Sequence, residues 1–94
     1  GRNQELALAA ALDLATHPGI TIGALATDGT DGPTDSAGAI VDHSTLSRAT
    51  AHSFSPTEHL AYHDAYPLLD AIGDLLRSGP TNTNVNDLLF VIVK

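Results

Sequence analysis

The sequence has no cysteine, no methionine and no tryptophan in its 94 residues. Without cysteine, disulfides and thiolate metal ligands are excluded. No apolar run approaches the roughly 20 residues that a membrane-spanning helix needs, and the first residues, GRNQEL, lack the zones of a signal peptide. We therefore expect a soluble cytoplasmic protein without membrane contact. Because no initiator methionine is present, we also expect the chain to be part of a longer protein.

Positive charge is scarce as well. Four lysine and arginine residues stand against eleven aspartates and glutamates, which gives a net charge of −7. Nucleic acid and anionic membrane surfaces would be repelled by such a chain, so we exclude both as main partners. The two phenylalanines and two tyrosines are too scattered to form a base-stacking surface.

The residues that are present suit one small domain. Hydrophobic residues make up 43% of the chain, enough for a single core at this length. The Ala- and Leu-rich segment Glu5–Ala15 predicts a helix that ends at Pro18 and Gly19. Since its leucines do not fall on one stripe, we expect this helix to be buried on more than one side. The apolar runs Ile20–Ala26 and Asp87–Val93 predict two interior strands.

Between these strands the pattern predicts one short strand and three helices. The strand is Ala37–Val41, and the helices are Ser44–Ala51, Thr57–His63 and Tyr66–Leu76. Gly73 is expected to weaken the middle of the last helix. Helices that alternate with buried strands indicate an α/β fold, in which we expect a mixed β-sheet flanked by helices.

An acidic loop follows the first predicted strand. It reads TDGTDGPTD over residues 27–35, and its glycines and proline favour tight turns. Asp28, Asp31 and Asp35 supply oxygens suited to a hard cation such as Mg²⁺. Taken alone, such a loop is more often a solvated turn, so the metal hypothesis depends on the other motifs.

A second, uncharged loop precedes the last predicted strand. It reads SGPTNTNVN over residues 78–86 and offers hydroxyl, amide and backbone N–H groups that suit phosphate oxygens. It is neither a P-loop nor a G-x-G-x-x-G turn. The acidic loop leaves its strand, whereas this loop enters one. If both line one cleft, Ile20–Ala26 and Asp87–Val93 must therefore run antiparallel.

Two histidines, His59 and His63, stand four residues apart on a predicted helix. This spacing can place two imidazoles on one zinc ion. No third ligand is evident nearby, and the zincin glutamate is missing. A solvated or core-edge pair is the favoured interpretation.

Three segments carry a family resemblance: GRNQELALAAAL at 1–12, TDGTDGPTDSAGA at 27–39 and GPTNTNVNDL at 79–88. Together they resemble the C-terminal domain of the glycerate 2-kinases, also labelled MOFRL, and the match runs nearly end to end over residues 1–94. The chain departs from the family pattern at Ala26, Ala65 and Asn82. The first strands of that domain are expected upstream of Gly1.

The resemblance implies ATP-dependent phosphorylation of the 2-hydroxyl of D-glycerate. The reaction would take place in a cleft between this domain and a larger, Rossmann-like N-terminal domain that is missing here. The implied cofactors are ATP and Mg²⁺, and the implied partners are D-glycerate and the missing domain; a homo-oligomer is left open. The fragment alone is expected to be inactive.

Phosphoryl transfer depends on positioning and on stabilising spread negative charge. We assign Arg2 to the glycerate carboxylate or the transferred phosphate and choose Asp31 as the catalytic base. Asp28, Asp31 and Asp35 are the expected metal ligands. The expected substrate- and phosphate-binding residues are Arg2, Asn3, Thr27, Gly29, Thr34, Gly79, Thr81, Thr83 and Asn84.

Two other function classes stay open. The first is a hydroxypyruvate reductase, a name attached to relatives of this family, although no dinucleotide fingerprint supports it. The second is a non-catalytic binding or assembly module. Dependence on ATP rather than NADH would separate the first from a kinase.

Overall fold

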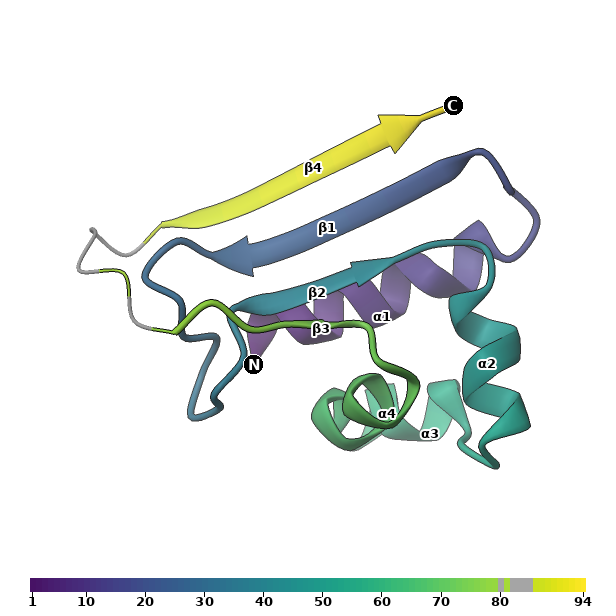
Figure 1. The fold of residues 1–94 in the computed structure, drawn as a ribbon. Coiled ribbons are helices and arrows are strands. Elements are labelled where there is room, and N and C mark those ends of the chain that lie inside the picture. Colours follow the sequence, from purple (N-terminus) through teal and green to yellow (C-terminus); the bar gives the residue numbers. More distant parts are fainter. Residues whose placement is uncertain (80, 82–85) are drawn as a thin grey trace.

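The computed structural model describes residues 1–79, 81 and 86–94. One long helix lies against the sheet, and the shorter helices pack beside it (Figure 1). In chain order the elements are α1 (Arg2–Leu14), β1 (Ile20–Ala26), β2 (Gly38–Val41), α2 (Thr45–Ala51), α3 (Pro56–Ala61), α4 (Ala65–Ile72), β3 (Leu75–Leu76) and β4 (Asp87–Val93). None of the helices in the described residues is long and apolar enough to cross a membrane.

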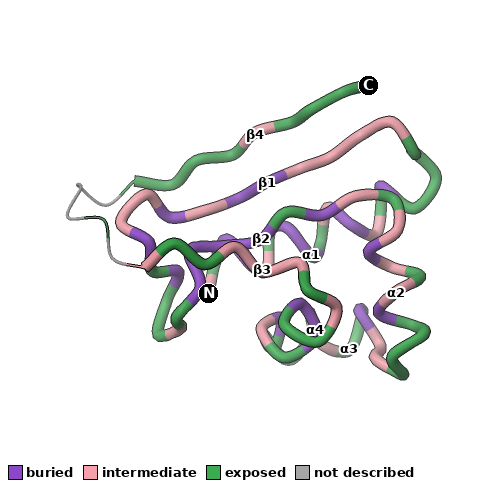
Figure 2. The backbone as a smooth tube through the Cα atoms, in the orientation of Figure 1, coloured by how far each residue is buried: buried purple, intermediate pink, exposed green. Residues whose placement is uncertain are grey.

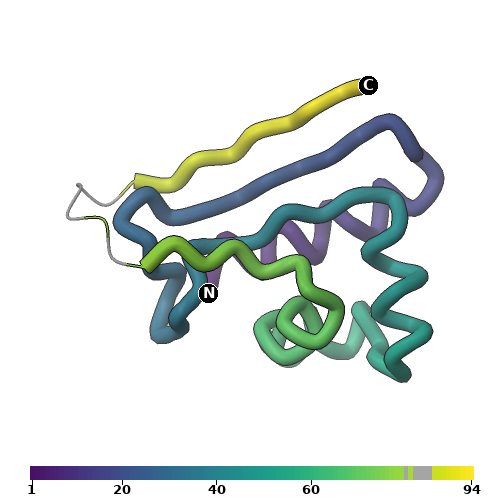
Figure 3. The backbone as a smooth tube through the Cα atoms, viewed as in Figure 1, coloured from purple at the N-terminus to yellow at the C-terminus, as the bar shows by residue number. Residues whose placement is uncertain are grey.

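The strands form one sheet in the order β3-β2-β1-β4. The α/β class is confirmed, but the three pairings described are all antiparallel, so the sheet is not mixed. The short connection from β1 to β2 explains the direction of that pair, because parallel neighbours need a long crossover. β1 and β4 come from distant parts of the sequence and lie side by side (Figure 3). Their antiparallel pairing is the one that a shared cleft requires.

Helix α1 packs one face against β1 and β2. Its buried residues recur at the helical period and are Asn3, Gln4, Ala7, Leu8, Ala11 and Leu14. α1 also packs against α3 and α4, so it is covered on more than one side as predicted, but Leu6 is 47% exposed and the helix is not buried all round. The small side chains of Ala7 and Ala11 let the helix lie close to the strands, and the leucine positions alone did not reveal that stripe.

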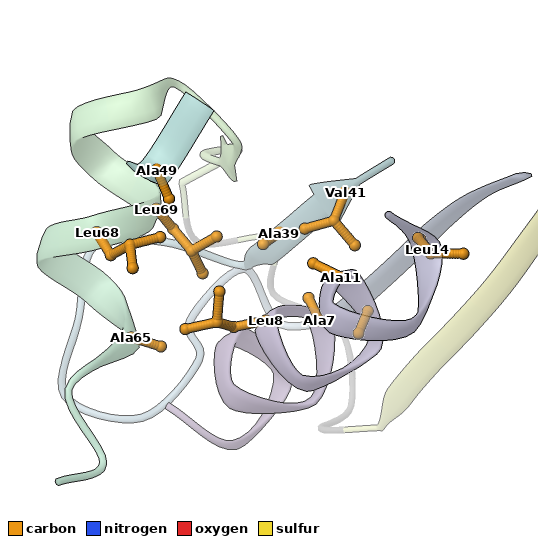
Figure 4. Packing of buried hydrophobic residues seen from close by; sticks show 11 residues of the cluster. Ala7, Leu8, Ala11, Leu14, Ala39, Val41, Ala49, Ala65, Leu68 and Leu69 are labelled. Atoms are coloured by element: carbon orange, nitrogen blue, oxygen red, sulfur yellow. The ribbon is translucent and has the colours of Figure 1, made fainter. Parts of the chain in front are cut away.

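The core fills the space between α1, the sheet and α4 (Figure 4). Leu8 of α1 lies near Leu68 and Leu69 of α4, and all three are fully buried. On the sheet side, Ala39 and Val41 of β2 close the same cluster. This packing fixes the start of α1 relative to β1 and β2.

The short helices follow their sequence signals with one exception. Ser55 caps α3, its hydroxyl accepting the Glu58 N–H at 3.4 Å, and Pro56 is the first helical residue. Gly73 does not sit inside α4 but ends it, with a left-handed φ of 79°. The prediction that this helix runs to Leu76 is therefore wrong, because Leu75–Leu76 form strand β3.

Strand β4 lies at the margin of the sheet. Six of its seven residues are exposed and the seventh is partly buried (Figure 2). The prediction that Asp87–Val93 is an interior strand is therefore wrong for this chain. An apolar sequence predicts burial, but the covering helix α1 lies over β1 and β2 and leaves β4 open.

Candidate functional site

The two polar loops meet at the end of the β1–β4 pair. The Thr27 N–H donates to the Asn86 carbonyl at 2.8 Å, and the Asn86 N–H donates to the Thr27 hydroxyl at 3.1 Å. Thr81 donates through its N–H to the Asp28 carbonyl at 3.2 Å and through its hydroxyl to the Thr27 carbonyl at 2.7 Å. The acidic loop and the described part of the second loop are thus one connected surface.

Two glycines allow this close approach. Gly29 has a left-handed φ of 87°, and a Cβ at that position would lie 2.0 Å from the Gly79 carbonyl oxygen. Gly79 also has a positive φ, of 73°. A side chain at position 29 would therefore push the two loops apart.

The N-terminus of α1 joins the same surface through Asp31. The Asp31 carboxylate accepts the backbone N–H of Asn3 at 3.0 Å and that of Gln4 at 2.8 Å, and also the Asn3 amide at 3.2 Å. The residue is only 3% exposed. Both carboxylate oxygens therefore satisfy helix N–H groups that would otherwise be buried without partners. This geometry argues against Asp31 as a catalytic base or metal ligand and favours a structural role.

Further contacts fasten the acidic loop to α1. The Gln4 amide donates to the Thr34 hydroxyl at 2.9 Å, and that hydroxyl donates to the Asp31 carbonyl at 2.8 Å. A Cβ on Gly1 would lie 2.3 Å from the Asp31 Cγ, so only glycine fits there. Thr34 is therefore part of the loop support, although it was predicted to bind substrate.

Arg2 projects from this assembly into solvent. Its guanidinium forms an ion pair with Asp87, and 80% of its side chain is exposed. The other Asp87 oxygen accepts the Asn3 amide at 3.0 Å. Asp87 thus holds both Arg2 and Asn3, a role that sequence reasoning missed. The available signal was its place within the GPTNTNVNDL motif, directly after the second loop.

The three aspartates of the acidic loop do not gather around one point. One Asp28 oxygen accepts the Thr30 N–H at 3.1 Å, while Asp31 caps α1. Asp35 accepts the Tyr66 hydroxyl at 2.8 Å and the Arg77 guanidinium at 3.2 Å. Within the described ranges, no three histidine or carboxylate side chains form a group that could hold a metal ion. The hypothesis of one metal site made by all three is not supported by this geometry.

The partners of Asp35 also change its ionisation. The hydrogen bond from Tyr66, together with the hydrogen bond and positive charge of Arg77, holds the pKa of Asp35 below its usual value of 3.8. Arg77 in turn has a raised pKa, chiefly because it also donates to Asp70, at 2.9 Å. Asp35 therefore ties the loop to α4 and to Arg77, which follows β3, and is poorly suited to accept a proton.

The predicted residues fall into three groups. Residues that the structure brings to the loop surface are Arg2, Asn3, Thr27, Asp28, Gly29, Asp31, Thr34, Gly79 and Thr81. Asp35 is turned to the Tyr66–Arg77 pair. Thr83 and Asn84 lie outside the described residues.

The prediction that His59 and His63 share one helix is wrong, because α3 ends at Ala61 and His63 lies beyond it with a left-handed φ of 54°. The His59 ring nitrogen contacts the Asp64 carbonyl oxygen at 2.7 Å, whereas His63 contacts Glu5 of α1 at 2.6 Å. A shallow surface pocket lies here, lined by Glu58, His59, Tyr62 and Asp64. None of these residues belongs to the loop surface.

Fold and site together define an α/β domain that presents a polar loop surface at one end of an antiparallel sheet. The chain belongs to the MOFRL family, which matches residues 1–87. It is 50% identical over 93 residues to the D-glycerate 2-kinase of Thermotoga maritima, covering 99% of this chain and 22% of that protein. A relative from Agrobacterium vitis, provisionally named a hydroxypyruvate reductase, is 43% identical over 93 residues. That match covers 99% of this chain and 21% of the relative.

A solved structure confirms the fold. The crystal structure of glycerate kinase from Thermotoga maritima matches with a TM-score of 0.96 and 49% identity. The match covers 100% of this chain and 23% of that one. The chain therefore spans about a fifth of the length of the relatives it matches.

Proposed function

We propose that residues 1–94 form the C-terminal part of an ATP-dependent glycerate 2-kinase, which phosphorylates the 2-hydroxyl of D-glycerate. The observation that carries this proposal is the meeting of the acidic loop, the second loop and the tip of α1 on one surface. The name of the 50% identical relative supports the reaction. The larger, N-terminal domain would supply the other wall of the cleft, in a cytoplasmic enzyme.

Arg2 is the described residue best placed to meet an anionic ligand. Its guanidinium is exposed at the edge of the loop surface, and a planar fork can bind a carboxylate or phosphate through two hydrogen bonds. Asp87, which also accepts the Asn3 amide, pairs with this guanidinium. Substrate binding would exchange the Asp87 partner for the glycerate carboxylate or the phosphoryl group.

Asp28 is the carboxylate of the acidic loop that best fits Mg²⁺ or the substrate hydroxyl proton. Asp28 is partly buried, and only one of its two carboxylate oxygens has a partner among the described residues. A single carboxylate suits Mg²⁺, which usually keeps several waters and binds phosphate oxygens as well. ATP would supply the phosphoryl group, and Mg²⁺ would offset its charge. The backbone of Gly29 and Gly79 and the hydroxyl of Thr81 would orient the transferred group.

A coupled assay on the full-length protein tests this proposal. We expect D-glycerate to be consumed only with ATP and Mg²⁺, with release of ADP and a phosphate on carbon 2. Oxidation of NADH by hydroxypyruvate without any ATP requirement would overturn the proposal in favour of the reductase. Substrate affinity without either turnover would favour the binding-module alternative.

A further inference from the structure

Strand β4 exposes an unusual amount of apolar surface. Its exposed large hydrophobic residues are Leu88 (49%), Leu89 (56%), Val91 (55%), Ile92 (49%) and Val93 (71%). Outside β4, only Leu6, Ile40 and Tyr62 are exposed large hydrophobics in the described residues. A continuous apolar patch of this kind on a soluble domain usually marks an interaction site.

Both faces of β4 are bare. Side chains alternate along a strand, and Leu89 and Val91 pair with Ala24 and Ile22, which pack toward α1. They are nevertheless exposed, because α1 lies over β1 and β2 (Figures 1 and 2). Leu88, Phe90 and Ile92 point to the opposite face of the sheet. A partner must therefore cover both sides of the strand.

The outer backbone edge of β4 is also unpaired within the described residues. The Lys94 N–H donates to the Gly19 carbonyl, and the Asn86 carbonyl accepts the Thr27 N–H, both at 2.8 Å. Because successive residues alternate in direction, the even-numbered residues of β4 face β1. The odd-numbered residues Leu89, Val91 and Val93 direct their N–H and carbonyl groups away from the sheet.

We propose that this edge pairs with an extended, apolar strand from the part of the full-length protein outside residues 1–94. A strand satisfies the outward backbone groups and, with its own flanking structure, covers both faces, which a helix in a groove would not do. The relatives are four to five times longer than the matched region, so a full-length protein of their length would have ample chain to supply such a strand. A second copy of this chain fits less well, because each carries a net charge of −7.

The added strand would lie beside the loop surface. β4 begins at Asp87, the residue that holds Arg2. Pairing along β4 would therefore fix the position of the rest of the protein relative to the proposed phosphoryl-transfer site. The proposed pairing depends only on the exposed edge and not on the reaction.

Amide hydrogen exchange in the full-length protein tests the pairing. We expect Leu89, Val91 and Val93 to be protected as strongly as Leu88, Phe90 and Ile92, at every protein concentration. Alternate protection, with only the even-numbered amides slow, would overturn the proposal. Protection of the odd-numbered amides that rises with protein concentration would instead show a second copy on the edge.

A pair of charge substitutions gives an independent readout. Val91→Lys in the full-length protein should lower the melting temperature by at least about 4 °C, since it places a lysine in a covered apolar contact. Tyr62→Lys is the matched control, because Tyr62 is 80% exposed outside the sheet. Equal, small effects of both substitutions would contradict the proposal. Kinase activity is not needed for either measurement.

Discussion

Strands β2 and β4 flank the same central strand, β1, yet they differ in almost every other respect. β2 carries Ala39 and Val41, which are at most 1% exposed under α1, whereas β4 carries Leu89 and Val93 at 56% and 71%. The more hydrophobic sequence is thus the less buried one. The difference shows that the apolar content of a strand does not by itself determine how much of it is buried within this chain. Burial also depends on which strands the helix covers.

The largest expected effect contrasts the two regions directly. Leu8→Ala should destabilise residues 1–94 by about 2–5 kcal/mol, because Leu8 is fully buried and its removal leaves a cavity. Leu89→Ala in the same chain should cost under about 1 kcal/mol, since its side chain is already largely in water. Urea denaturation of both variants provides the comparison. Equal losses would show that β4 is covered within the chain itself.

Two glycines sharpen the contrast at the backbone. A Cβ on Gly38 of β2 would lie 1.9 Å from the Ala24 carbonyl oxygen of β1, whereas the atoms nearest to a Cβ on Gly23 of β1 belong to the Phe90 ring, at 2.2 Å. Gly38→Ala should therefore cost about 1–3 kcal/mol or more, because main chain must shift. Gly23→Ala should cost less, since the Phe90 ring of the edge strand can turn aside. A larger loss of thermal stability in Gly23→Ala than in Gly38→Ala would contradict the claim that β2 is packed more tightly against β1 than β4 is.

Two carboxylates of one loop allow a similar comparison. Asp31→Ala removes the acceptor for two backbone N–H groups of α1 and should destabilise the protein by about 1–3 kcal/mol. Asp28→Ala should change stability by less than about 0.5 kcal/mol, because it loses one exposed contact. The activity of the full-length enzyme should respond in a different way, with Asp28→Ala lowering turnover in a protein that stays folded.

The smallest expected effect concerns pH. Asp35 has a pKa below its unfolded value of 3.8, so its stabilising contribution is present above that pH and declines as the pH falls below it. Because Asp35 is exposed, the slope should be shallow. Asp35→Asn should flatten the acid limb of a stability-against-pH curve. An unaltered acid limb in Asp35→Asn would contradict the assigned Tyr66 and Arg77 contacts.

Much of the fold could be predicted from the sequence because helix starts and turns are set by residues within a few positions of them. Pro56 and Ser55 start α3, and the TDGTDGPTD turn follows β1, as expected. The antiparallel direction of β1 and β4 was also correct, because it followed from a requirement that both loops meet. Burial was harder to predict, since it depends on which strands α1 covers.

The sequence could indicate a candidate site but could not assign a role to each of its residues. Composition pointed to Asp28, Asp31 and Asp35 as equivalent oxygen donors. The structure separates them, because Asp31 faces the N–H groups of α1 and Asp35 faces Arg77. These partners are 27 and 42 residues away, and no spacing rule links them. Asp87 was missed for the same reason, since its contact with Arg2 spans 85 residues.

The most direct test of the central claim concerns Arg2 in the full-length enzyme. If the loop surface and the tip of α1 form one phosphoryl-transfer site, Arg2→Ala should lower kcat/KM for D-glycerate by about 100-fold or more. Lys94→Ala, which removes a positive charge at the opposite end of β4, should leave kcat/KM unchanged. A folded Arg2→Ala enzyme with full kcat/KM would contradict the claim.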